Sequence, residues 1–258
     1  MWNKELETAR RAAKAAGKIL SDSFGFVNNV MKKGAIDLVT DADLEAEKVV
    51  LETIQDDFPA DNILSEEAGN HQHASSDRTW IVDPLDGTTN FAHGFPFFAV
   101  SIALAVENET VLGVVYNPCM EEFFLAQKGQ GTFLNGEPLH VTETAGLEDA
   151  LLATGFPYDV HEHPDRVMTL FKRFLVRAQG IRRLGTAALD MCYVAAGRLD
   201  GFWEQDLHPW DTAAGDILVR EAGGHVTTFS GGAYTPYEKT VLASNGLIHE
   251  DMVAVVSK

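Results

Sequence analysis

The chain has 258 residues and a formal net charge of -18 at pH 7, from 20 lysines and arginines against 38 aspartates and glutamates. This excess of acid argues against a duplex-binding surface, which needs clustered cations, and against binding to anionic membranes. Hydrophobic residues make up 45% of the chain, which is ordinary for a soluble globular protein of one large or two smaller domains.

The lack of a recognisable span or signal peptide, together with the cysteine usage, favours a cytoplasmic protein. No run approaches the roughly 18 apolar residues of a membrane span. Four cations between residues 10 and 18 interrupt the place where a signal peptide needs an apolar stretch. Cys119 and Cys192 have no motif spacing, so neither a disulfide framework nor a zinc site is supported. We therefore expect no membrane partner and no direct binding to nucleic acid.

The first part of the chain predicts two helices followed by several adjacent strands. Apolar residues at helical spacing predict a helix at 3–22, and 25–34 predicts a strand or loop. Thr40 and Asp43 fit a capping box for a second helix that ends at Phe58. Strands are predicted at 62–67, 80–82, 97–106, 111–116 and 122–126, with turns at 107–110 and 135–136. This order favours helices packed on a largely antiparallel sheet.

Beyond residue 145 the predicted elements alternate between strand and helix. The predicted strands are 150–154, 180–183, 199–203, 225–229 and 241–244, and the predicted helices are 163–178, 185–197, 209–223 and 246 onward. Alternation of this kind indicates an α/β part with some parallel pairing. We expect an α+β part at 1–145 and an α/β part at 146–258, with a soft boundary near 141–150 and a site that spans it.

The stretch 80–91 is the most informative in the chain. An apolar run at 80–82 predicts a buried strand that ends on Asp83, because Pro84 stops sheet pairing, and 86–89 is turn chemistry that could open a helix. Two carboxylates three residues apart at a strand end suit a hard cation such as Mg²⁺, and amides that begin a helix would face an anion beside it. An ordinary tight turn is the alternative, because Pro-x-Asp-Gly is a common turn sequence.

Two further segments place acids at the ends of elements. Glu66 and Glu67 close a predicted strand, and Asp211 follows Pro209, which fits the first turn of a helix. Each acid also has a structural explanation, since carboxylates are stabilised near helix amino termini and Asp43 can act as a cap. Capping alone does not explain why three segments, those at 66–67, 80–91 and 209–211, all place acids at the ends of elements. A metal beside an oxyanion is instead typical of phosphoryl chemistry.

These segments resemble the signature of the inositol monophosphatase family of Mg²⁺-dependent, lithium-sensitive phosphatases. The matching stretches are Glu66-Glu67, 80–91, 210–215, 37–40 with Asp43, 185–188 and Gly223-Gly224. The resemblance covers nearly the whole chain. It implies a layered αβαβα sandwich of the sugar phosphatase type, a homodimer, and metal ions held between the two parts of the chain.

The resemblance implies a set of metal ligands. One Mg²⁺ would bind Glu66, Asp83 and the backbone carbonyl of Leu85. A second would bind Asp83, Asp86 and Asp211, and Glu66 with waters would hold a weaker third ion. The expected cofactor is therefore Mg²⁺, with two or three ions in each site.

The resemblance also implies catalytic and substrate contacts. Thr88, hydrogen-bonded to Asp43, would orient the attacking water, so Glu66, Thr88 and Asp43 form the expected catalytic set. The amides of Gly87 and Thr88 would receive the phosphate. Lys32 matches a position near the metal cluster. The expected contacts to the substrate alcohol are Asp86, Ala187, Glu204 and Asp211.

Several functional alternatives stay open at this point. Direct attack by water is favoured, because no histidine in the motif could activate Thr88 as a nucleophile. The neutral Thr89 favours a small uncharged polyol with one phosphate, such as inositol 1-phosphate. Glu204 suits vicinal hydroxyls, although it could also be one of many surface acids. Fructose 1,6-bisphosphate and 3'-phosphoadenosine 5'-phosphate are alternative substrates, and a regulatory binding role with the transcription machinery is an alternative of another class.

Overall fold

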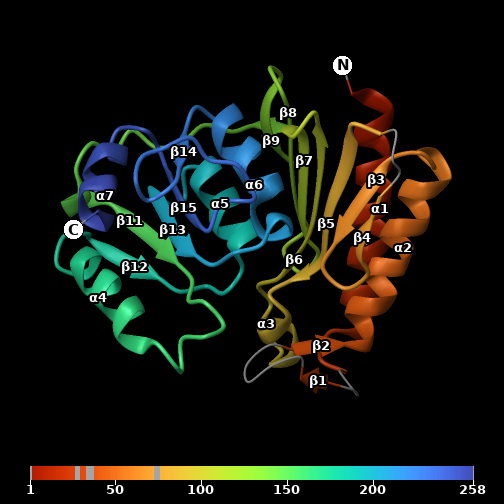
Figure 1. The fold of residues 1–258 in the computed structure, drawn as a ribbon, viewed down its shortest axis with the longest axis horizontal. Helices are drawn as coiled ribbons and strands as arrows, with labels where there is room; N and C mark the ends of the chain where they lie inside the picture. The colour runs from red at the N-terminus through yellow and green to blue at the C-terminus, as the bar shows by residue number, and fades with distance from the viewer. Residues whose placement is uncertain (1, 27–29, 33–37, 73–75, 258) are drawn as a thin grey trace.

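The chain is arranged in alternating layers of helix, sheet, helix, sheet and helix (Figure 1). The structure is a computed structural model that describes residues 2–26, 30–32, 38–72 and 76–257. The eight-stranded sheet lies on the right of Figure 1 and the five-stranded sheet on the left, with α5 and α6 between them. This arrangement confirms the αβαβα sandwich that the sequence resemblance implies.

The first sheet is antiparallel apart from the parallel pairing of β3 with β5, and its strand order is β10-β9-β8-β7-β6-β5-β3-β4. Its strands are β3 (Asn62–Ser65), β4 (Gly69–His71), β5 (Arg78–Asp86), β6 (Ala99–Val106), β7 (Glu109–Asn117), β8 (Glu122–Gln127), β9 (Gly131–Leu134) and β10 (Glu137–Pro138). Helices α1 (Asn3–Ser23) and α2 (Asp41–Asp57) pack on its outer face, and the pair β1 (Val30–Lys32) and β2 (Leu38–Thr40) stands apart from it.

The second sheet is mixed, with the order β12-β11-β13-β15-β14. Its strands are β11 (Leu151–Thr154), β12 (Gly180–Arg182), β13 (Gly201–Gln205), β14 (His225–Thr227) and β15 (Thr240–Ser244). The pairs of β11 with β12 and β13 are parallel, so the carboxyl ends of these strands meet at one edge. The remaining helices are α3 (Thr88–Ala92), α4 (Pro164–Leu175), α5 (Ala187–Ala195), α6 (Pro209–Glu221), α7 (His249–Val256) and a short 3₁₀ turn at Leu147–Asp149.

The predicted elements are recovered with changes at their ends. The capping box predicted for the second helix is confirmed, because the Thr40 amide donates to Asp43 Oδ2 at 2.9 Å and the Asp43 amide faces Thr40 Oγ1. Within the stretch predicted as strand or loop at 25–34, the structure shows the short strand β1. Residues 27–29 and 33–34 lie outside the described residues, as does Asp37 of the matched 37–40 stretch.

The prediction that Pro84 ends the central strand is wrong. Strand β5 continues to Asp86, and its pairing with β6 shifts between Asp83, opposite Ser101, and Asp86, opposite Ala99. Between these pairs, Pro84 and Leu85 of β5 lie opposite the single residue Val100 of β6, which is a β-bulge. A bulge leaves one residue outside the hydrogen-bond ladder, so a proline without an amide hydrogen is tolerated there.

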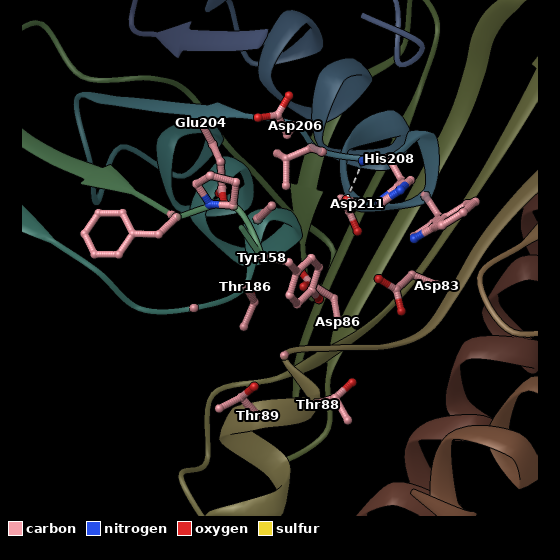
Figure 2. Close-up of a pocket in the computed structure, with 18 of the residues that line it drawn as sticks. Asp83, Asp86, Thr88, Thr89, Tyr158, Thr186, Glu204, Asp206, His208 and Asp211 are labelled. Carbon is pink, nitrogen blue, oxygen red and sulfur yellow. Dashed lines mark hydrogen bonds and ion pairs between the residues drawn. The ribbon is translucent and has the colours of Figure 1, made fainter. Parts of the chain in front are cut away.

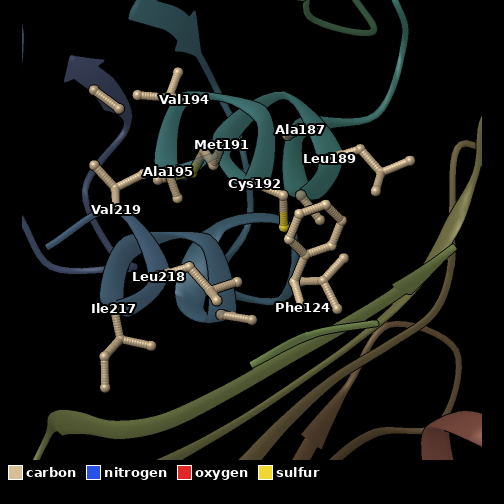
Figure 3. Close-up of a cluster of buried hydrophobic side chains, with 14 of the residues drawn as sticks. Phe124, Ala187, Leu189, Met191, Cys192, Val194, Ala195, Ile217, Leu218 and Val219 are labelled. Atoms are coloured by element: carbon tan, nitrogen blue, oxygen red, sulfur yellow. The ribbon is translucent and has the colours of Figure 1, made fainter. Parts of the chain in front are cut away.

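Helices α5 and α6 form the apolar layer between the sheets, and Figure 3 shows them side by side above the strands of the first sheet. Helix α5 is buried almost throughout, which agrees with close packing of its alanines. On β7, Gly113 faces α6 at close range. A Cβ at Gly113 would lie 2.8 Å from the carbonyl oxygen of Ala214 and 2.7 Å from Ile217 Cγ2. Any side chain there would have to move α6 or the strand.

The division of the chain near residue 145 stays a proposal. The last strand of the first sheet ends at Pro138 and the first strand of the second begins at Leu151. Across the described ranges, no helix is both long enough and apolar enough to cross a bilayer.

We expect Gly113→Ala to lower the free energy of unfolding by about 1 to 3 kcal/mol, because the added methyl overpacks the contact between β7 and α6. Chemical denaturation monitored by circular dichroism measures this loss. Gly232→Ala is the control, since Gly232 is exposed and a Cβ there would lie 3.3 Å from Thr228 Oγ1, a side-chain atom. Equal unfolding energies for both variants would contradict the close packing of α6 on the first sheet.

Candidate active site

A cavity of about 550 Å³ opens between the two sheets, within the size range of small-molecule sites. Its walls come from the end of β5 with α3, the carboxyl ends of β11 and β13, and the amino ends of α5 and α6. In Figure 2, Asp83 and Asp211 lie on the right of the cavity, Thr88 below and Glu204 at the upper left. The acidic side chains that line it are Glu66, Asp83, Asp86, Glu204, Asp206 and Asp211.

The bulge in β5 directs both of its aspartates into this cavity. Asp83 Oδ1 accepts a hydrogen bond from the Leu85 amide at 3.0 Å, across the bulge. Asp86 Oδ2 accepts from the Ala188 amide at 2.8 Å, in the first turn of α5. The structure therefore ties the end of the first sheet to the central helical layer through the Asp86 carboxylate.

Asp211 reaches the same cavity from α6. The helix begins at Pro209, as predicted, and Asp211 Oδ2 accepts from the His208 amide at 2.6 Å. The capping interpretation of Asp211 is thus confirmed. The carboxylate also lines the cavity, so capping fixes its position without removing it from the site.

These carboxylates share an unfavourable electrostatic environment. Burial, and then the charges of Glu66, Asp86 and Asp211, raise the pKa of Asp83 well above the usual range for an aspartate. Burial also raises the pKa of Asp211 well above that range, with Asp86 adding to the effect. Burial raises the pKa of Asp86 to about 7, against the hydrogen bond from Ala188. Ionising these acids together therefore requires a compensating positive charge.

The chemistry of this donor set fits a hard divalent cation. Carboxylate and carbonyl oxygens are the ligands that Mg²⁺ prefers, and a cation between them removes their repulsion. In the ranges that the structure describes, no three acidic, histidine or cysteine side chains are already gathered into a finished set of ligands. The cavity therefore fits Mg²⁺ in the chemical type and the burial of its oxygen donors.

Thr88 and Asp43 form the hydroxyl-carboxylate pair implied by the resemblance. Thr88 Oγ1 lies 3.1 Å from Asp43 Oδ1 and also 3.1 Å from the carbonyl oxygen of Leu85. The Thr40 amide and hydroxyl hold the other oxygen of Asp43. Burial raises the pKa of Asp43 to about 6, so it is mostly ionised at neutral pH. Asp43 is consequently both a helix cap and the acceptor beside Thr88.

The position of Gly87, at the amino end of α3, has no room for a side chain. Its φ is +94°, and a Cβ there would lie 2.8 Å from Thr186 Cγ2 and 3.2 Å from the carbonyl oxygen of Phe97. A glycine therefore lets the turn after Asp86 pass close to the start of α5.

The far wall of the cavity contains Glu204, which is not a surface acid. Only 7% of its surface is exposed, and burial raises its pKa to about 8, with Arg183 acting in the opposite direction. Arg183 is the only lysine or arginine lining the cavity in the described part of the chain, and its guanidinium lies 5.4 Å from the ring centre of Phe156. Ala187 lines the same region.

Sequence reasoning missed several residues of this wall, among them Gly155, Phe156, Tyr158 and Arg183. Their signal was a glycine and proline directly after the predicted strand at 150–154, where the carboxyl end of a parallel strand commonly meets a ligand. Lys32 ends β1, but its side chain lies outside the described residues.

A layered αβαβα fold with a shared acidic cavity between its sheets defines a sugar-phosphatase type of protein. The chain belongs to the inositol monophosphatase family, whose sequence pattern matches residues 1–258, and it is therefore a phosphatase by family.

Named relatives and solved structures cover almost the entire chain. It is 43% identical to an inositol-1-monophosphatase of Mesorhizobium japonicum, over 96% of this chain and 94% of the relative. It is 41% identical to Nus factor SuhB of Escherichia coli K12, with the same two coverages. The IMPase structure from Thermotoga maritima matches with a TM-score of 0.91 and 41% identity, over 98% of this chain and 97% of that one.

The repulsion among the buried acids predicts an unusual effect of Asp83→Asn. An aspartate whose folded-state pKa is raised contributes stability below its unfolded value near 4 and loses it as pH rises through the folded value. In EDTA the variant should therefore melt at a higher temperature than wild type, by a margin that grows between pH 4 and 8. Added Mg²⁺ should stabilise the variant less than wild type.

Differential scanning calorimetry across this pH range measures both effects. Asp22→Asn is the control, because the Asp22 side chain is 65% exposed and, within the described ranges, forms an ion pair only with Lys18. A metal-free Asp83→Asn protein that melts below wild type at pH 8, with an unchanged response to Mg²⁺, would contradict the repulsion.

Proposed function

We propose that this phosphatase hydrolyses the phosphate monoester of a small polyol, with inositol 1-phosphate as the first candidate, and that it requires Mg²⁺. The observation that carries the proposal is the meeting of Glu66, Asp83, Asp86 and Asp211 in one cavity beside Thr88. Relatives named inositol-1-monophosphatase in Mesorhizobium japonicum and Synechocystis, 43% and 44% identical, support the choice of substrate.

The proposed metal ligands are the four acids with the carbonyl of Leu85. Glu66, Asp83 and Leu85 would hold one ion, and Asp83, Asp86 and Asp211 a second, with Glu66 available to a third. When bound, Mg²⁺ supplies Lewis acidity that acidifies water and offsets negative charge on the phosphate and the leaving oxygen. Lithium sensitivity is part of the same proposal and rests on the family resemblance.

Thr88 is proposed to orient the attacking water. A threonine hydroxyl has one hydrogen and two lone pairs. When Thr88 Oγ1 donates to the ionised Asp43, 3.1 Å away, its lone pairs are left to accept a hydrogen bond from water. Asp43 cannot turn away, because Thr40 holds its other oxygen. We assign the amides of Gly87 and Thr88 to the phosphate.

The alcohol part of the substrate would lie toward the far wall. Asp86, Ala187, Glu204 and Asp211 are proposed to contact it, and all four line the cavity. Glu204 suits this role because its carboxylate can hydrogen-bond two neighbouring hydroxyls. Thr89, which also lines the cavity, adds no charge there.

A bisphosphate is the second candidate substrate, and Arg183 favours it. Its guanidinium is a positive group on the cavity wall near Glu204, where a second phosphate of fructose 1,6-bisphosphate could bind.

A phosphate-release panel tests the substrate assignment. It contains inositol 1-phosphate, fructose 1,6-bisphosphate, 3'-phosphoadenosine 5'-phosphate and histidinol phosphate, each with Mg²⁺, with EDTA and with added lithium. We expect inositol 1-phosphate to give the highest kcat/KM, EDTA to abolish release and lithium to inhibit it. A higher kcat/KM for another ester would make that ester the assigned substrate. Phosphate release that persists in EDTA would overturn the metal dependence.

A role outside catalysis is a further candidate, because relatives 41% identical carry the name Nus factor SuhB. We propose that this chain could bind the transcription machinery as well as hydrolyse phosphate, and that it forms a homodimer. Sedimentation equilibrium tests the dimer. Co-purification of RNA polymerase with wild type and with Asp83→Asn tests whether such binding is independent of the acidic cavity.

Thr88→Ala should lower kcat by about 10² to 10³-fold with little change in melting temperature, because it removes a group that orients the water. Steady-state kinetics and calorimetry on the same preparations measure this. Thr53→Ala is the control, since the Thr53 hydroxyl donates a hydrogen bond to the Val49 carbonyl within its own helix, α2. A Thr88→Ala protein that melts far below wild type yet keeps its kcat would leave Thr88 with a purely structural role.

A further inference from the structure

Gly155 and Glu204 lie side by side at the carboxyl edge of the second sheet. Strands β11 and β13 are parallel, and Thr154 is paired with Trp203, so the next residues of the two strands are Gly155 and Glu204. Both line the cavity. A Cβ at Gly155 would lie 2.0 and 2.1 Å from the two carboxylate oxygens of Glu204 and 2.2 Å from its Cδ. The carboxylate thus occupies the space that a side chain at Gly155 would fill.

The surrounding contacts leave the two strands little freedom to separate. Thr154 Oγ1 donates to the carbonyl oxygen of Trp203 at 2.8 Å, which ties β11 to β13 directly before the pair. The ring of Trp203, on β13, stacks on Phe174 of α4 with a centroid distance of 4.0 Å. An added side chain at Gly155 would therefore displace the Glu204 carboxylate and leave the backbone in place.

Charge limits the direction in which the carboxylate could move. Asp190 on α5 is fully buried, and after burial itself the charge of Glu204 is the largest influence that raises the pKa of the Asp190 carboxyl. Movement toward Asp190 would bring two acid side chains together in the protein interior and raise the cost of ionising either one. The roomier direction is the cavity of about 550 Å³, because a second hollow lined by Gly155 and Glu204 holds only about 10 Å³. In the cavity, a displaced carboxylate would occupy the place of the substrate alcohol.

We infer that Gly155 is a specificity-determining residue: its missing side chain lets the Glu204 carboxylate lie back in the cavity wall and keeps room for a polyol. The inference rests on the proposed function and extends it to a substrate class. Phosphate esters with a hydroxylated ring depend on this room. Esters whose alcohol carries no hydroxyls, such as p-nitrophenyl phosphate, depend on it less.

The test measures Gly155→Ala with two substrates. We expect kcat/KM for inositol 1-phosphate to fall at least tenfold, mainly through KM, within the 10 to 200-fold range of a small steric misfit. The fall with p-nitrophenyl phosphate should be several times smaller. Gly180→Ala, on neighbouring β12, is the control for adding a methyl to a sheet glycine, since a Cβ there would lie 3.3 Å from Leu151 Cδ1.

A double variant separates steric displacement from general damage. Glu204→Asp shortens the acid by one methylene and makes room for the added methyl. Gly155→Ala should therefore lower kcat/KM by a smaller factor in the Glu204→Asp protein than in wild type. Equal losses on both substrates, or effects of the two changes that simply multiply, would overturn the inference.

Failure of the proposed function gives a different result. A wild type inactive on the whole panel would remove the polyol assignment, while the same variants compared by melting temperature would still measure the steric coupling. Coupling in stability without any polyol hydrolysis would reduce Gly155 to a packing role and overturn its role in specificity.

Discussion

The site depends on buried carboxylates that repel one another and are held in place by backbone amides. Asp83 is fixed by the Leu85 amide, Asp86 by Ala188 and Asp211 by His208, at 3.0, 2.8 and 2.6 Å. Each of these amides belongs to a different element: the bulge of β5, the start of α5 and the approach to α6. Because these hydrogen bonds hold the carboxylates close together, ionising all of them requires a compensating positive charge, which a bound divalent cation would supply.

The central helical layer that carries two of these amides is closely packed. Helices α5 and α6 bury apolar side chains between the sheets (Figure 3), and residues at their amino ends line the cavity. At Gly113 and at Gly87, adjacent segments approach to distances that no side chain would allow. Packing density in this layer therefore sets the separation of the acids that come from the two sheets.

Much of this architecture could be predicted from the sequence, because the decisive signals are local. Acids at strand ends, Pro209 in the first turn of α6 and the Thr40-Asp43 cap depend on neighbours within a few residues, and the structure retains them. The course of β5 past Pro84 was predicted wrongly, since a bulge is defined by pairing with a second strand.

The far wall of the cavity could not be predicted from local patterns for a related reason, and only the family resemblance assigned Ala187 and Glu204 to the site. Gly155 and Glu204 are 49 positions apart, and they meet because β11 and β13 pair in one register. No local pattern distinguishes Glu204 from the surface acids of a chain with net charge -18, although its exposed fraction is only 7%. Long-range register, which sequence spacing does not carry, decides which residues line this wall of the cavity.

Anomalous diffraction from crystals soaked in Mn²⁺, used in place of Mg²⁺, tests the central claim most directly. The account predicts ordered anomalous peaks among the carboxylates of Glu66, Asp83, Asp86 and Asp211, with no peak at the Asp83 position in Asp83→Asn crystals. Peaks confined to surface acids, or none at millimolar Mn²⁺, would show that the buried carboxylates are not a metal site and would contradict the account.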